Sequence, residues 1–124
     1  MTPAGLAIRR VPGKGRGVFA TRPFTQGELL ATCPTLELPP ADCRRLDGTA
    51  LHNHYFTSAD VPGGLLALGP LTLVNHAVPP NADWDYRHDP DAGWLADLRA
   101  VREIEAGEEV TIDYNTELWF EAVG

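Results

Sequence analysis

Glycine and proline punctuate this chain so often that a helix-dominated fold is excluded. The 124 residues include 12 Gly and 11 Pro, and these residues break helices while they supply turns. Short apolar or alternating runs lie between them, as is typical of β-strands. The sequence therefore predicts a mainly β fold with many turns. One hydrophobic core fits this length, so we expect a single domain over residues 1–124.

The clearest strand predictions are runs of apolar or β-branched residues bounded by turn residues. They cover residues 6–11, 17–21, 29–38, 71–74 and 110–114, and Pro34 is expected to interrupt the third.

The other segments give weaker patterns. Residues 54–58 and 65–69 are predicted as a pair of short strands, or as a strand and a turn. Residues 94–104 alternate well enough for a strand, although their leucines also suit a helical period. We expect a short helix within 40–51 and a polar surface loop over 83–93.

An excess of acidic residues limits the partners that this chain can have. The net charge is -7, from 17 Asp and Glu against 10 Lys and Arg. Nucleic-acid binding needs phosphate-neutralising cations, so we expect no direct contact with DNA or RNA. A basic protein or peptide suits this charge better.

Composition also predicts where the protein works. No run approaches the roughly 20 apolar residues of a membrane span, and the N-terminus lacks the apolar centre of a signal peptide. Cys33 and Cys43 are too few for a disulfide framework and are expected to be reduced thiols. We therefore expect a cytoplasmic protein without membrane contact. Abundant Ala, Gly, Pro, Arg and Asp, with few Lys, Ile and Asn, also fits a bacterial genome rich in G and C.

Three common kinds of site find little support. The two histidines of the segment HNH (52–54) could ligate a metal, but zinc needs three or four ligands and neither cysteine stands at a familiar spacing, so we predict no metal. Gly15 and Gly17 precede a predicted strand, not a helix, which excludes a dinucleotide fingerprint. The one serine, Ser58, lies in no nucleophile elbow, and Cys33 is expected to be an inert buried thiol.

One apolar run ends in two strong hydrogen-bonding side chains and then breaks at a Pro-Pro-Asn sequence. This segment, residues 71–81, reads LTLVNHAVPPN. Alone, such an ending is typical of any surface strand. Two further segments, KGRGVFATRPFTQGELL (14–30) and IEAGEEVTIDY (104–114), also lie at predicted strand junctions.

In this order the three segments resemble the SET-domain protein lysine methyltransferases. That family combines a Gly-x-Gly segment, an Asn-His followed by Pro-Asn, and a closing Gly-Glu-Glu segment that ends in Tyr. The matching residues are Gly15, Gly17, Val18, Phe19 and Ala20; Asn75, His76, Pro80 and Asn81; and Gly107, Glu108, Glu109, Val110, Thr111 and Tyr114. The resemblance covers most of the chain and is closest to the minimal, stand-alone forms of viruses and bacteria.

The resemblance implies a SET-domain fold of small curled β-sheets with a threaded C-terminal segment, a pseudoknot that is rare among proteins. Pro80 and Asn81 would close the loop through which this segment passes, which would bring Tyr114 beside Asn75.

The resemblance also implies S-adenosylmethionine as the cofactor. The Asn side chain of the family motif would bond the methionine end of the cofactor, and the main chain of the His would bond the adenine edge. Glycines let the backbone approach the ligand closely. An aromatic residue would cross the adenine, although an aromatic pair near a C-terminus more often docks on a core. The implied cofactor-binding residues are Lys14, Gly15, Arg16, Gly17, Asn75, His76, Tyr114 and Trp119.

For the reaction, the resemblance implies an enzyme that methylates lysine side chains, with Tyr114 as the central catalytic residue. Transfer is an in-line displacement at carbon, so positioning can supply most of the rate. Tyr55 would be a second catalytic residue, and it would line the substrate channel with Trp84 and Leu118. Ordinary packing is the alternative for Tyr55 and Trp84.

Two positions depart from the family pattern. Ala77 stands where the family usually has Ser, which removes a hydroxyl from the loop, and Leu118 stands where many relatives have a further tyrosine. The number of methyl groups transferred is therefore left open. The rival interpretation is a catalytically weak or inactive SET scaffold that serves as a peptide-binding or cofactor-sensing module. A homodimer that completes a substrate groove is compatible with either.

Overall fold

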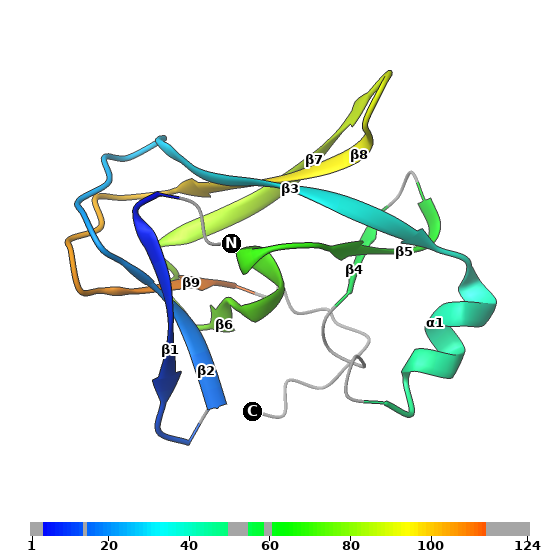
Figure 1. Cartoon of the computed structure of the whole chain (residues 1–124), viewed down its shortest axis with the longest axis horizontal. Coiled ribbons are helices and arrows are strands. Elements are labelled where there is room, and N and C mark those ends of the chain that lie inside the picture. Colours follow the sequence, from blue (N-terminus) through cyan, green and yellow to red (C-terminus); the bar gives the residue numbers. More distant parts are fainter. Residues whose placement is uncertain (1–3, 14, 50–54, 59–60, 114–124) are drawn as a thin grey trace.

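Two β-sheets form the body of the protein in a computed structural model, which describes residues 4–13, 15–49, 55–58 and 61–113 (Figure 1). The four-stranded sheet has the order β1-β2-β9-β6, with bounds Leu6–Val11, Gly15–Ala20, Glu109–Ile112 and Asn75–His76. The five-stranded sheet has the order β4-β5-β3-β8-β7, with bounds Phe56–Ser58, Val61–Ala67, Leu29–Leu38, Gly93–Ala100 and Ala82–Asp89. One helix, α1 (Pro40–Leu46), and one 3₁₀ turn, η1 (Pro70–Leu73), complete the described elements. The predicted mainly β architecture is confirmed.

The N-terminal hairpin pairs β1 with β2 along their full length, from Leu6 opposite Ala20 to Val11 opposite Gly15. The first strand has the predicted bounds, but β2 begins two residues earlier than predicted. Gly15 has a φ of 87°, a conformation that few other residues adopt, and it joins the ladder as the strand leaves the turn. The hairpin therefore carries the glycine segment within a strand.

β3 also has its predicted bounds, and the expected interruption at Pro34 is wrong. Pro34 lies opposite Leu95 of β8, and its carbonyl accepts a hydrogen bond from the Leu68 amide at 2.8 Å. Proline removes only a donor from a strand, so the acceptor side of the ladder continues.

The polar loop expected over 83–93 is wrong, because most of it forms β7, an edge strand of the five-stranded sheet. Its side chains alternate between half-buried aromatics, Trp84 and Tyr86, and exposed charges. Every residue of β7 pairs with β8, from Ala82 opposite Ala100 to Asp89 opposite Gly93. The strand prediction for β8 is thereby confirmed over the helical alternative.

The apolar segment before Asn75 was predicted as a strand, and this is also wrong. Gly69, with a φ of 145°, is followed by the turn η1. Three residues complete one turn of a 3₁₀-helix, so Leu71 and Val74 project to the same side, where both are buried. The predicted helix within 40–51 is confirmed as α1 but is shorter, and it buries Cys43.

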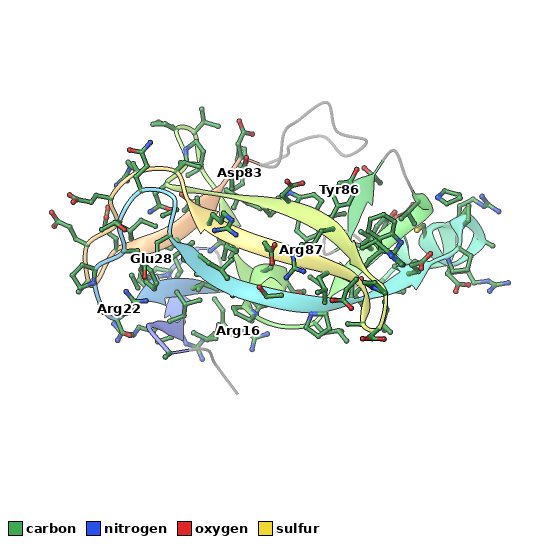
Figure 2. The ribbon with its side chains drawn as sticks, turned by 90° about the horizontal axis from the view of Figure 1, so that it is seen from above. Arg16, Arg22, Glu28, Asp83, Tyr86 and Arg87 are labelled. Carbon is green, nitrogen blue, oxygen red and sulfur yellow. The ribbon has the colours of Figure 1, made fainter. Side chains whose placement is uncertain are left out.

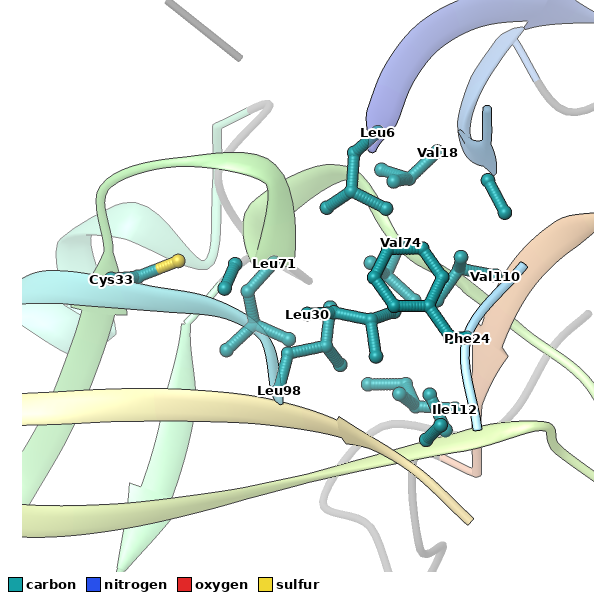
Figure 3. Packing of buried hydrophobic residues seen from close by; sticks show 14 of the residues in the cluster. Leu6, Val18, Phe24, Leu30, Cys33, Leu71, Val74, Leu98, Val110 and Ile112 are labelled. Carbon is teal, nitrogen blue, oxygen red and sulfur yellow. The ribbon is translucent and has the colours of Figure 1, made fainter. Parts of the chain in front are cut away.

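The core lies between the two sheets (Figure 3). Strands from both sheets supply it, with Val18 and Ile112 from the four-stranded sheet and Leu98 from the five-stranded sheet. Phe24 and Ile104, joined by an isolated bridge, are both buried within this cluster. Among the described residues, no helix is long and apolar enough to cross a membrane.

A carboxylate lies almost buried on the outer face of the five-stranded sheet. Asp97 is 8% exposed and accepts hydrogen bonds from Thr32 Oγ1 at 2.7 Å and from Arg87 Nε at 2.8 Å; Figure 2 shows Arg87 over this face. Burial acts to raise the pKa of Asp97, but the bonds from Arg87 and Thr32 outweigh it and hold the pKa below its usual value.

We expect Asp97→Asn to lower the free energy of unfolding by about 1–2 kcal/mol near neutral pH, because it removes the charge from two hydrogen bonds. Arg87 is half exposed, so water screens its share. A lowered folded-state pKa gives stability that is present above the unfolded value of about 3.9 and is lost as pH falls through the folded value. Urea unfolding should therefore give a difference that shrinks below about pH 4. Asp91→Asn, at an exposed turn residue, is the control, and an equal loss there would contradict the assignment.

Candidate functional site

The Asn75 side chain joins two neighbouring strands of the four-stranded sheet. β6 pairs in parallel with β9, so Asn75 lies opposite Thr111. The Asn75 amide nitrogen donates to the Arg16 carbonyl of β2 at 3.0 Å and to Glu109 Oε2 of β9 at 2.6 Å. Segments about 60 and 35 residues away in the chain therefore meet at one amide group.

Gly17 lies directly against this group. A Cβ atom at Gly17 would be 2.5 Å from Glu109 Oε2 and 2.9 Å from Asn75 Nδ2, closer than side chains approach each other. At Gly15 such an atom would meet nothing within 4 Å. Glycine is favoured at that position by its positive φ and not by a lack of space. The structure thus brings Gly17, the Arg16 carbonyl and Asn75 together.

The segment after Asn75 holds β9 in place. Asn81, 3% exposed, donates from Nδ2 to the Glu109 carbonyl at 2.8 Å, and its Oδ1 accepts from the Thr111 amide at 2.8 Å. Its side chain thereby bonds β9 as a neighbouring strand would. Ala77 adds a bond from its amide to the Ile112 carbonyl at 3.0 Å.

The described residues include the segments that flank β9, which are part of the expected threading. β9 lies between β2 on one side and the segment 75–81 on the other. His76 Nδ1 lies 3.9 Å from Asp113 Oδ1 at the last described residue. Tyr114, Leu118 and Trp119 lie outside the described residues, as does Lys14. Their predicted roles stay predictions.

Tyr55 is buried between α1 and β5. It is 8% exposed, its hydroxyl donates to Asp47 Oδ1 at 2.9 Å, and its ring lies against Gly64. Burial and, after it, the Asp47 carboxylate raise its pKa above the usual value. The phenol is therefore protonated at neutral pH, and its hydrogen bond to Asp47 holds Tyr55 at the end of α1. Its predicted catalytic role stays a prediction.

Trp84 belongs to a row of rings on the five-stranded sheet. Its ring centroid lies 4.4 Å from that of Phe56 and 5.9 Å from that of Tyr86, and the row continues from Tyr86 to Trp94 and His88. Trp84 also packs on the core cluster. These contacts give it a structural role, and its predicted place in a substrate channel stays a prediction.

No role in the site was predicted for Glu109 from the sequence, although this residue matched a motif position. Its position follows from the pairing of β2 with β9, which sets Phe19 opposite Glu109 and so turns Glu109 toward Gly17. The available signal was the alternation of polar Glu109 and Thr111 with apolar Val110 and Ile112 in the sequence.

The donors and acceptors of this site fit the amino-acid end of S-adenosylmethionine. Asn75 Oδ1 and the Glu109 carboxylate can accept hydrogen bonds from an ammonium group. Arg16 contributes its carbonyl to the site, whereas its exposed side chain alternates with Gly17 along β2 and leaves the opposite face of the strand, so its predicted cofactor contact stays a prediction. Among the described residues, no group of three or more His, Cys, Asp or Glu side chains is arranged to hold a metal.

Comparison with known proteins agrees with the motifs. The model of the family "SET domain" matches residues 15–115. The histone-lysine N-methyltransferase specific for H3 lysine-37 of Schizosaccharomyces pombe is 32% identical over 117 residues, which cover 94% of this chain and 77% of that protein. The N-lysine methyltransferase KMT5A-A of Danio rerio is 29% identical over 89% of this chain but only 35% of its own length.

Solved structures share the fold. A proposed histone methyltransferase of Plasmodium falciparum superposes with a TM-score of 0.80 at 23% identity, over 95% of this chain and 99% of that one. ctPRC2 bound to S-adenosylmethionine superposes with a TM-score of 0.74 at 18% identity, over 94% of this chain and 16% of that one. With the family match and the curated relatives, the predicted identity is confirmed: the chain belongs to the SET-domain family of S-adenosylmethionine-dependent protein-lysine methyltransferases.

Proposed function

We propose that this protein transfers a methyl group from S-adenosylmethionine to lysine side chains of basic proteins. The observation that carries the proposal is the meeting of the glycine strand, the Asn75 amide and the Glu109 carboxylate at one point. When bound, the cofactor supplies a methyl group on a cationic sulfur. The residues of the chain then have to hold it and admit a lysine in line with it.

The target lysine must lose its proton before it can attack. Its reference pKa is about 10.4. An apolar channel and a nearby positive charge both disfavour the ammonium form, which lowers that pKa on binding. In the proposal, the Tyr114 hydroxyl oxygen accepts a hydrogen bond from the amine and orients its lone pair.

The distribution of charge supports a basic substrate. All 17 Asp and Glu residues follow position 27, whereas half of the 10 Lys and Arg residues precede position 23. Asp83 and Asp85 project from the exposed side of β7, an edge strand; Asp89 ends this strand, and Asp91 lies in the turn that follows. Such a field attracts Lys- and Arg-rich segments and raises their encounter rate. The yeast relative is named for a histone, and histone-like, nucleoid and ribosomal proteins are basic candidates.

Incubation with cofactor carrying a labelled methyl group tests the proposal directly. The full chain is mixed with a fractionated cell lysate, and mass spectrometry identifies what is methylated. Label on lysine side chains of basic proteins is the expected result. Calorimetry that finds cofactor binding without any transfer would favour the non-catalytic module instead, and no binding would reject both.

Neutralising two aspartates of β7 should slow the binding of a basic substrate. We expect the double variant Asp83→Asn/Asp85→Asn to lower kcat/KM for a basic protein about threefold at low ionic strength, because steering by surface charge is lost. The difference should fade near about 0.5 M salt, where the Debye length is only a few ångströms. Cofactor affinity should not change.

A matched double variant, Glu37→Gln/Glu103→Gln, removes two exposed carboxylates elsewhere. It should leave kcat/KM closer to wild type. Equal losses in the two double variants would point to net charge alone and contradict a role for β7.

We also propose that the protein works in the cytoplasm. Cys33 and Cys43 are free thiols, and both are buried, which fits a reducing compartment. Cell fractionation tests the location. The homodimer stays a prediction, which sedimentation of the full chain would test.

A further inference from the structure

Both N–H bonds of the Asn75 amide are used inside the protein. One acceptor is the Arg16 carbonyl at 3.0 Å, and the other is Glu109 Oε2 at 2.6 Å. An Asn side chain has two donor hydrogens and one acceptor oxygen. Once these two bonds are made, only Oδ1 is left for a ligand.

The alternative orientation of the amide is unfavourable. A carbonyl oxygen and a carboxylate can only accept hydrogen bonds. If the amide were turned over, Asn75 Oδ1 would face both of them, with a carboxylate oxygen only 2.6 Å away, and two bonds would be lost. The Arg16 carbonyl belongs to the backbone of β2 and cannot turn away, so Glu109 and β2 together fix the orientation.

We infer that Glu109 is a positioning residue of the cofactor site, and that it sets Asn75 as an obligate acceptor for the protonated amine of the cofactor. The inference rests on the proposed function, since it requires S-adenosylmethionine to bind beside Asn75. Gly17 is needed for this contact, because a Cβ atom there would occupy the space that the ends of the Glu109 and Asn75 side chains fill. The site therefore selects a ligand that carries an ammonium group at its amino-acid end.

The contact itself can be tested without any cofactor. In a ¹⁵N-correlated spectrum of the free protein, the side-chain amide pair of Asn75 is identified by its loss in Asn75→Ala. A hydrogen bonded to a carboxylate at this distance should resonate downfield of ordinary Asn amides. In Glu109→Ala this shift should disappear. A pair with ordinary shifts in the wild-type protein would overturn the inference.

Calorimetry with three ligands tests the consequence. S-adenosylmethionine and S-adenosylhomocysteine carry the amino-acid end, and 5′-methylthioadenosine does not. We expect Glu109→Ala to weaken the first two about tenfold, the loss of one charge-supported hydrogen bond, and to leave the third within about twofold. Glu109→Gln keeps an acceptor oxygen for Asn75 and should recover most of the affinity.

The outcomes separate the inference from the proposed function. Equal weakening of all three ligands would mean a general structural role and would overturn the inference, as would unchanged affinity in Glu109→Ala. A wild-type protein that binds none of the ligands would overturn the proposed function and the inference together. Glu103→Ala removes an exposed carboxylate nearby in sequence and should change no affinity, and thermal unfolding of each variant identifies any that fails to fold.

Discussion

Replacing Tyr114 with phenylalanine should lower turnover about 100-fold, whereas cofactor affinity should stay within a few-fold of wild type. The change removes one oxygen and keeps the ring. The resemblance to SET enzymes gives this hydroxyl the task of orienting the lysine amine, and misplacement of a reacting group by about 1 Å can cost a factor of that size. Turnover is measured with the labelled cofactor and a basic protein, and affinity by calorimetry.

The described residues end one position before this tyrosine. The chain leaves β9 at Asp113, whose carboxylate lies 3.9 Å from the His76 ring. The described chain therefore ends beside β6, the strand that carries Asn75.

Tyr86→Phe provides a matched control for that prediction. It removes the same oxygen from a tyrosine in the aromatic row of β7, a part of the five-stranded sheet. Turnover should stay within about twofold of wild type, because this half-buried tyrosine lies on the sheet that carries neither Gly17 nor Asn75. The catalytic assignment of Tyr114 would be abandoned if Tyr114→Phe kept wild-type turnover, or if both variants lost it equally.

Strands whose pattern is local could be predicted from the sequence. β1 and β3 have the expected bounds because apolar residues and flanking turn residues define them without reference to the rest of the fold. β7 could not be recognised in the same way. Its exposed positions carry aspartate and arginine, so the average composition is that of a loop. Its strand conformation depends on the ladder with β8, which comes from tertiary pairing.

The turn before Asn75 shows the opposite difficulty. The segment from Leu71 to Val74 has the apolar content of a strand, yet it folds as η1. A short apolar run is ambiguous by periodicity alone. Gly69 and Pro70, at the start of the run, decide between the two, because one has a positive φ and the other occupies the first position of the turn.

The site was predictable where a motif names the residue and not where the fold creates the contact. Gly17 and Asn75 were expected to lie together, and the Asn75 amide does lie against Gly17 although β9 separates their strands in the sheet. Glu109 acquires its contact only through the register between β2 and β9. The structure gives no reason for the Ala77 departure, since the bond from its backbone amide to the Ile112 carbonyl would form with a serine there as well.

Gly17→Ala should lower kcat/KM about 100-fold and weaken S-adenosylmethionine at least about tenfold, while the fold survives. The new methyl group would lie 2.5 Å from Glu109 Oε2 and 2.9 Å from Asn75 Nδ2, whereas ordinary contact begins at 3.4 Å. The two groups must therefore retreat by 3.4 − 2.5 = 0.9 Å and 3.4 − 2.9 = 0.5 Å. Both atoms are ends of side chains, so they can move without displacing a strand.

In this variant, cofactor affinity should consequently fall much more than the free energy of unfolding. Alanine is preferred over glycine in a strand by roughly 0.5–1 kcal/mol, which offsets part of the overpacking cost of about 1–3 kcal/mol. Urea unfolding should show a loss near 1 kcal/mol. Gly48→Ala is the control, because its new atom would meet only the Arg45 carbonyl at 4.0 Å. If the damage passes through the displaced Asn75–Glu109 pair, adding Glu109→Ala to Gly17→Ala should weaken cofactor binding no further. Additive losses would instead mean that the methyl group blocks the ligand directly.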